Sequence, residues 1–164
     1  MGGMQSLVQE IKSILTQREE SLSLAESCTG GLISAAIAAE PGVSRFFKGA
    51  VVSYSAELKS DLLAVPKPWL KGYGEVSLPV ARAMARGARS VMRSTWAVSV
   101  TGIAGPSGGS PDKPVGTVCF AVVGPGIEEV VQQLFGKGSE PQRQDLQHQA
   151  GLFALELLLR QIRV

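Results

Sequence analysis

Strand-like and helical segments alternate along most of this chain, and this order restricts the folds open to it. Short apolar runs bounded by turn residues predict strands over 21–25, 50–54, 96–100, 115–123 and 127–135. Helical apolar spacing or alanine-rich composition predicts helices over 4–18, 32–40, 56–63, 77–94 and 141–163. Ser55 and Ser139 are the expected N-caps of the third and the last, and Val91 is expected to face inward on the fourth. The proline-rich segment 65–68 is expected to be a loop. The last two strands are joined by Gly124-Pro125-Gly126, which indicates a hairpin.

Alternation of this kind predicts the α/β class. We expect one three-layer α/β/α domain over 1–164, with residues 1–3 interpreted as a cloning scar. The sheet is predicted to be mixed and mostly parallel, with about five strands and an antiparallel C-terminal hairpin. Helices should cover both of its faces.

The composition argues against several classes of protein. Of the 164 residues, 45% are hydrophobic, and there is no apolar run long enough to span a membrane. A net charge of +2 without a dense basic block, together with 5% aromatic residues, does not favour nucleic acid. One histidine and two separated cysteines argue against a metal site. Free cysteines and the lack of a signal peptide predict a cytoplasmic protein.

Three loops rich in small and polar residues each follow a predicted strand. They are AESCTGG at 25–31, the turn from Tyr54 to Lys59, and TGIAGPSGGS at 101–110. Ligands of such sheets bind beyond the carboxyl ends of the strands. We therefore expect the three loops to converge on one site.

Ser27 is the candidate nucleophile of that site. A serine hydroxyl needs an adjacent base, and the one histidine, His148, falls within the last predicted helix. A Ser-His-Asp triad and a Cys28–His148 pair are therefore not expected. Lys59 is the available base if burial lowers its pKa, and Tyr54 could relay the proton or orient the ammonium group.

The glycines have two interpretations. The amides of Thr29, Gly30 and Gly31, at the start of a helix, are candidates for stabilising an oxyanion. Alternatively, the glycines permit close packing of helix and strand, while Ser27 and Thr29 cap the helix. The loop 101–110 lacks the phosphate-loop pattern, so it is either an anion-binding nest or a surface loop.

Three motifs, AESCTGG, GAVVSYSAELKSDLLAV (49–65) and VSVTGIAGPSGGSPDKPVGTVCFA (98–121), carry a family resemblance. In this order they resemble the C-terminal domain of the competence/damage-inducible protein CinA, from about Leu7 to Leu159. Stand-alone members of that family are nicotinamide-nucleotide amidohydrolases. The chain resembles that form, because it leaves no room for the N-terminal domain of full-length CinA.

The resemblance implies deamidation of nicotinamide mononucleotide (NMN) to nicotinic acid mononucleotide, without a metal or cofactor. The family's catalytic residues match Ser27, Tyr54 and Lys59, with Ser27 as the nucleophile and Cys28 as a bystander. It also implies a small-molecule nucleotide as the partner and a homo-oligomeric state. The residues expected to bind the substrate or oxyanion are Thr29, Gly30, Gly31, Thr101, Gly102, Ala104, Gly105 and Arg143.

The region before the last helix departs from the family pattern. Arg143 is retained, but Gln142, Gln144 and Gln147 replace two acids and a second arginine. An arginine contributes charge and hydrogen bonds to phosphate binding. Two alternatives follow: an amidase of the same fold acting on another small amide, and a non-catalytic nucleotide-binding module.

Overall fold

The computed structural model describes residues 2–137 and 140–164. Its helices are α1 (Gly2–Arg18), α2 (Leu32–Ala38), α3 (Ala56–Leu63), α4 (Lys67–Gly72), α5 (Leu78–Met92) and α6 (Arg143–Ile162), with a 3₁₀ turn, η1, at Val43–Arg45. Its strands are β1 (Leu22–Glu26), β2 (Phe47–Val52), β3 (Trp96–Gly102), β4 (Thr117–Gly124) and β5 (Ile127–Leu134). In the described part of the chain, no helix is both long and apolar enough to cross a membrane.

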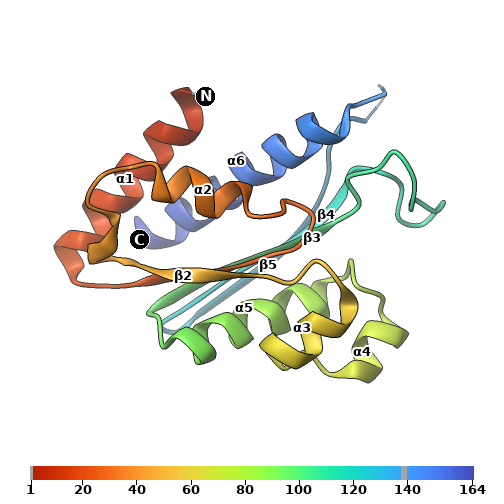
Figure 1. Ribbon diagram of the computed structural model, residues 1–164, viewed down its shortest axis with the longest axis horizontal. Helices are drawn as coiled ribbons and strands as arrows, with labels where there is room; N and C mark the ends of the chain where they lie inside the picture. The colour runs from red at the N-terminus through yellow and green to blue at the C-terminus, as the bar shows by residue number, and fades with distance from the viewer. Residues whose placement is uncertain (1, 138–139) are drawn as a thin grey trace.

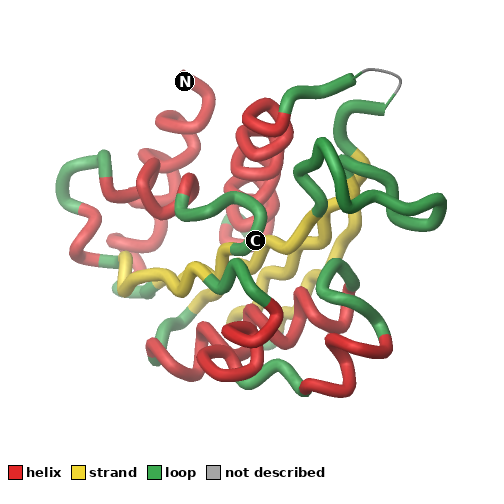
Figure 2. The backbone as a smooth tube through the Cα atoms, turned by 45° about the vertical axis from the view of Figure 1, so that its right-hand side comes forward, coloured by secondary structure: helices red, strands yellow, loops and turns green. Residues whose placement is uncertain are grey.

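The five strands form one open sheet in the order β2-β1-β3-β4-β5. β1 pairs in parallel with β2 and β3, whereas β4 pairs antiparallel with both β3 and β5. Helices α1, α2 and α6 lie on one face of the sheet, and α3, α4 and α5 lie on the other (Figure 1). Figure 2 shows the strands side by side between the two groups of helices. The predicted mixed sheet, C-terminal hairpin and three layers are confirmed.

The core is divided between the two faces of the sheet. β1 and β4 are buried along their full length, because helices cover both of their faces. On the α1/α2/α6 side the core includes Leu15, Leu24, Phe120 and Leu158. On the α5 side it includes Met84 and smaller residues, mostly alanine and valine. Removal of this apolar surface from water stabilises the layers and so holds the ends of the strands in place.

Several element boundaries differ from the sequence prediction. Strand β2 ends at Val52, two residues early, because the carbonyls of Ser53 and Tyr54 turn toward Lys59. The proline-rich segment expected to be a loop forms α4, with its proline in the first turn, where the missing amide costs no hydrogen bond.

The last helix also starts later than predicted. Helix α6 begins at Arg143, after Gln142, and no side-chain cap is formed there. The N-cap predicted at Ser139 lies outside the described residues. On α5, Val91 was expected to face inward but is 61% exposed, one residue before the helix ends at Met92.

Candidate active site

The loops after β1, β2 and β3 meet at one edge of the sheet, as expected from their places after predicted strands. Pairing continues past the strand ends: Ser27 N donates to Val100 O at 3.0 Å, and Ser53 N donates to Glu26 O at 2.9 Å. These bonds fix Ser27 relative to the neighbouring loops.

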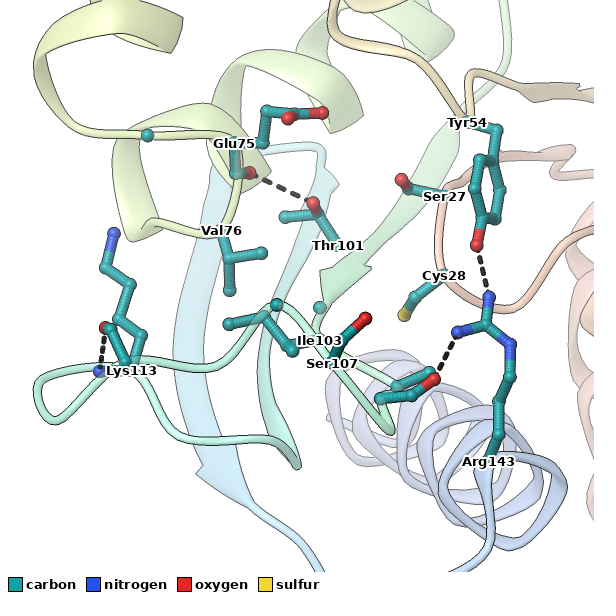
Figure 3. A pocket seen from close by; sticks show the side chains of 16 residues that line it. Ser27, Cys28, Tyr54, Glu75, Val76, Thr101, Ile103, Ser107, Lys113 and Arg143 are labelled. Atoms are coloured by element: carbon teal, nitrogen blue, oxygen red, sulfur yellow. Dashed lines mark hydrogen bonds between the residues drawn. The ribbon is translucent and has the colours of Figure 1, made fainter.

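A pocket of about 420 Å³ opens at this edge (Figure 3). Its lining comes from the three strand-end loops, the segment before α5 and the start of α6. The lining residues are Ser27, Cys28, Tyr54, Gly74, Glu75, Val76, Thr101, Gly102, Ile103, Ala104, Gly105, Ser107, Gly108, Ser110, Lys113 and Arg143.

Lys59 and Ser27 form a buried hydrogen-bonded pair beside the pocket. A bond of 2.8 Å joins Lys59 Nζ to Ser27 Oγ, and Lys59 Nζ donates to Ser53 O at 2.7 Å. Ser55 caps α3 by accepting from Leu58 N, so Lys59 lies in the first turns of a helix that starts directly behind the site.

Electrostatics at Lys59 favour a neutral amine more than in an ordinary lysine. The side chain is fully buried, and this burial lowers the pKa of Lys59 below its ordinary value of 10.5. The Glu75 carboxylate, 3.5 Å from Nζ, opposes the shift. A neutral amine in contact with a serine hydroxyl can accept its proton.

Tyr54 contacts Lys59 through its backbone, whereas its hydroxyl was expected to relay the proton or orient the ammonium group. Its backbone carbonyl accepts from Lys59 Nζ at 3.4 Å, while its hydroxyl accepts from Arg143 Nη2. Arg143 Nη1 also donates to Gly105 O at 2.6 Å, so this arginine ties the second loop to the third (Figure 3). The phenol therefore lies against Arg143 and makes no hydrogen bond to the ammonium group in the described structure.

The turn at Thr29, Gly30 and Gly31 holds Ser27 from behind and does not line the pocket. Gly30 N donates to Ser27 O at 3.0 Å, so the Gly30 amide expected to face an oxyanion has another acceptor. Both glycines have left-handed φ values, 60° and 101°, which side chains rarely adopt. The alternative prediction of helix caps at Ser27 and Thr29 is wrong, because the N-cap of α2 is Gly31 and no side chain caps it. Close packing does not require the glycines either, since an added Cβ would meet nothing within 4 Å at Gly30 and only Val52 at 3.7 Å at Gly31. The backbone conformation of the turn is what requires them.

Glu26 is a structural residue of the site that sequence reasoning missed. Its fully buried carboxylate accepts from Thr29 Oγ1 at 2.7 Å, from Ile33 N at 3.1 Å and from Ser34 N at 2.9 Å. A carboxylate here satisfies free amides at the start of α2 and complements the helix dipole. The available signal was an acid at the end of a predicted strand, in the turn that leads to a helix.

The glycine-rich loop forms the far wall of the pocket. Lys113 Nζ donates to Tyr73 O at 2.8 Å, which ties this loop to the segment before α5. Gly102 lines the pocket where an added Cβ would lie 2.7 Å from Val118, so no larger residue fits without a shift. Thr101, Ala104 and Gly105, predicted to bind the substrate, also line the pocket. Lys113 was missed, although a lone cation in such a loop was a usable signal.

Glu75 was also missed, and its sequence context gives no signal. It lies between α4 and α5, in a segment that the periodicity left unassigned. Its backbone carbonyl accepts from Thr101 Oγ1 at 3.0 Å, which places its side chain beside Lys59. Only the tertiary structure brings this acid to the site.

Cys28 and Gln147 support the structure of the site and have no expected part in its chemistry. Burial raises the pKa of the Cys28 thiol to about 12, so the thiolate needed for a nucleophile does not form near neutral pH. Gln147 Nε2 donates to Cys28 O at 2.9 Å and so anchors the AESCTGG turn to α6. Gln142 precedes the first residue of α6.

No group of three or more His, Cys, Asp or Glu side chains that could hold a metal occurs among residues 2–137 and 140–164.

The fold and the site define an α/β protein with a serine–lysine pair in a pocket at the carboxyl edge of its sheet. The chain belongs to the CinA C-terminal domain family, whose profile matches residues 4–162. This confirms the resemblance seen in the three sequence motifs.

Relatives and solved structures agree with this assignment. A CinA-like protein of Anaeromyxobacter sp. (strain Fw109-5) is 46% identical over 149 residues, covering 91% of this chain and 35% of the relative. The chain thus spans 35% of the length of that relative, and similar shares of others. A crystal structure of competence/damage inducible protein CihA from Agrobacterium tumefaciens matches with a TM-score of 0.95 and 34% identity, covering 100% of this chain and 98% of that one. A competence or damage-inducible protein from Enterobacter asburiae matches with a TM-score of 0.91 and 33% identity, covering 97% and 98%.

Proposed function

We propose that this protein is an amidohydrolase that deamidates NMN to nicotinic acid mononucleotide and ammonia. The observation that carries the proposal is the 2.8 Å contact between Ser27 Oγ and the fully buried Lys59 Nζ. A hydroxyl paired with a desolvated amine is an activated nucleophile, suited to acyl transfer.

In the proposed first step, neutral Lys59 takes the Ser27 hydroxyl proton while Oγ attacks the carboxamide carbon. The C–N bond then breaks, and the Lys59 ammonium group returns its proton to the leaving nitrogen, which departs as ammonia. Water attacks the acyl-serine and gives a proton to Lys59. That proton returns to Ser27 Oγ as the acid is released, so the enzyme is restored.

The pocket supports a small anionic substrate. Its volume of about 420 Å³ falls within the usual range for small-molecule sites. Lys113 and Arg143 lie at opposite ends of the pocket and each can attract a phosphate (Figure 3). We assign Tyr54 the role of holding Arg143, because its hydroxyl bonds to that guanidinium.

Ammonia release from NMN, free nicotinamide and NAD tests the reaction and the need for a phosphate together. We expect release from NMN to fall by at least ~10³-fold in Ser27→Ala. Ser13→Ala, an exposed serine on α1, is the matched control and should retain the wild-type rate. Equal rates for wild type and Ser27→Ala would show that another group is the nucleophile.

A second candidate is an amidase of the same fold that acts on another small amide. It is favoured by Arg143, whose guanidinium already bonds to Gly105 O and Tyr54, and by Gln147, which bonds to Cys28 O and not to the pocket. A panel of carboxamides with and without phosphate distinguishes the two. Binding of NMN without ammonia release over hours would instead indicate a nucleotide-binding module.

A further inference from the structure

Glu75 forms an ion pair with the buried lysine of the site. Glu75 Oε1 lies 3.5 Å from Lys59 Nζ, and the side chains are 48% and 0% exposed, respectively. Among the described residues that line the pocket, Glu75 is the one acid. Its backbone carbonyl accepts from Thr101 Oγ1, which holds the Glu75 backbone at the pocket wall.

Two opposing effects act on the charge of Lys59. Burial favours the neutral amine, and the Glu75 carboxylate favours the ammonium form. The remaining polar contacts of Nζ are the Ser27 hydroxyl and the carbonyls of Ser53 and Tyr54, which carry no charge. The other titratable side chain acting on Lys59 is the Cys28 thiol, and its pKa, raised to about 12, keeps it neutral near physiological pH.

A ligand that changes the charge near Glu75 must therefore change the state of Lys59. In NMN the nicotinamide ring is a pyridinium cation, and its carboxamide must lie against Ser27 Oγ for attack. Ser27 Oγ is 2.8 Å from Nζ, and Nζ is 3.5 Å from the carboxylate, so a ring placed for attack lies close to Glu75. Opposite charges at such distances attract, most strongly where water is excluded.

We propose that Glu75 is a specificity-determining and positioning residue, which pairs with Lys59 in the empty pocket and with the cationic ring of a bound substrate. In the empty pocket the Glu75 carboxylate increases the charged fraction of Lys59 and so opposes activation of Ser27. The arriving cation takes over the carboxylate, and Lys59 then gives up its proton to water and becomes the base. This inference rests on the proposed amidohydrolase function, because it requires Lys59 to act on Ser27.

Two ligands with the same carboxamide but different ring charge distinguish the effect of the charge from that of the ring's shape. 1-Methylnicotinamide carries the pyridinium charge, whereas nicotinamide is neutral, and neither has a phosphate. Glu75→Gln removes the carboxylate but keeps the shape and the backbone contact. Glu57→Gln is the matched control, because Glu57 is an exposed acid on the helix that carries Lys59.

The first measurement is the ¹³Cε NMR titration of Lys59, assigned with Lys59→Met. We expect Lys59 to lose its proton at lower pH in Glu75→Gln than in wild type, and at unchanged pH in Glu57→Gln. Saturating 1-methylnicotinamide should lower that pH in wild type more than nicotinamide does, and this difference should vanish in Glu75→Gln. An unchanged titration in Glu75→Gln, or an equal change in Glu57→Gln, overturns the proposal.

The second measurement is ammonia release from both amides. The ratio of kcat/KM for 1-methylnicotinamide over nicotinamide should fall by roughly two- to fivefold in Glu75→Gln, as expected for an ion pair with one half-exposed partner. An unchanged ratio, or complete loss of activity on both amides at every pH, overturns the proposal. If wild type releases no ammonia from any amide, the proposed function fails, and the titration alone decides whether Glu75 governs Lys59.

Discussion

Ser27 Oγ and Lys59 Nζ lie 2.8 Å apart, although 32 positions separate the two residues in the chain. Ser27 follows β1, and Lys59 lies on the helix after β2. Because β1 and β2 are parallel neighbours, with Glu26 opposite Val52, both strands deliver the next loop to the same edge. The parallel pairing of the two strands brings Ser27 and Lys59 together, and neither sequence motif does so by itself.

Replacement of Lys59 by methionine should remove the base while keeping a side chain of similar length. We expect kcat for ammonia release to fall by about 10²–10⁴-fold, the usual contribution of a general base. Lys67→Met, an exposed lysine on α4, is the control. Circular dichroism should show that both variants fold, and near-wild-type activity in Lys59→Met would contradict the mechanism.

Replacement of Glu26 by alanine should destabilise the protein. The amides of Ile33 and Ser34 and the Thr29 hydroxyl would lose their buried acceptor. We expect the free energy of unfolding to drop by at least about 3 kcal/mol. Glu57→Ala should cost less than about 1 kcal/mol, because that acid is exposed in the first turn of α3. Urea unfolding gives both values, and equal losses would refute the special role of Glu26.

Replacement of Gly87 by alanine should disturb the packing of α3 on α5. An added Cβ would lie 2.0 Å from Leu63 O, a backbone atom that cannot move aside alone. We expect the free energy of unfolding to fall by about 1–3 kcal/mol, and ammonia release to fall as well, since α3 carries Lys59. Gly72→Ala is the matched control, because nothing lies within 4 Å of its added Cβ. Thermal unfolding at equal or higher Tm in Gly87→Ala would contradict the prediction.

Replacement of Arg143 by glutamine should weaken binding of a phosphorylated substrate. A charge-assisted contact contributes about 1.5–3 kcal/mol, so we expect KM for NMN to rise by roughly 10- to 100-fold. The effect on free nicotinamide should be much smaller, because it has no phosphate. Arg160→Gln removes the same charge from the other end of α6 and serves as the control. Equal effects on both substrates would place the phosphate elsewhere, with Lys113 as the next residue to test.

The two cysteines should make the protein less stable at alkaline pH. Burial raises the pKa of Cys28 to about 12 and that of Cys119 to about 11, from an ordinary value of 9.0. Above pH 9 the thiols of the unfolded chain lose protons, while the folded protein keeps them. The stability due to these thiols is therefore present below pH 9 and is lost as pH rises toward the folded values, by up to about 1.4 kcal/mol per pH unit for each thiol.

Urea unfolding in reducing buffer at about pH 8 and about pH 10 measures this loss. The variant with both cysteines replaced by alanine should lose less stability over the same interval. Lys59, whose pKa is lowered, acts in the opposite direction in both proteins, so the difference between them reports the thiols together with the effect of Cys28 on Lys59. An identical pH dependence in wild type and variant would refute the prediction.

Local sequence patterns predicted most of the fold because their causes are local. Ser55 was predicted as an N-cap, and its hydroxyl accepts the expected amide hydrogen bond. The helix start at Ser77 was predicted from the proline in its first turn, and Ser77 caps α5. The Gly124-Pro125-Gly126 hairpin was predicted for the same reason. Helix α4 was missed, because proline in a short polar segment is equally compatible with a loop and with the first turn of a helix.

The sequence by itself determined the α/β class, the loops that converge, and Ser27 and Lys59 as members of one site. Turn residues and apolar periodicity report local conformation, and they therefore predicted the elements and the loops that follow them. Only the tertiary structure decided that Glu26 supports the start of α2, that the Tyr54 hydroxyl bonds to Arg143, and that Glu75 reaches Lys59. These contacts join residues that no repeating sequence pattern relates. The charge of a buried lysine likewise depends on neighbours that only folding brings close to it.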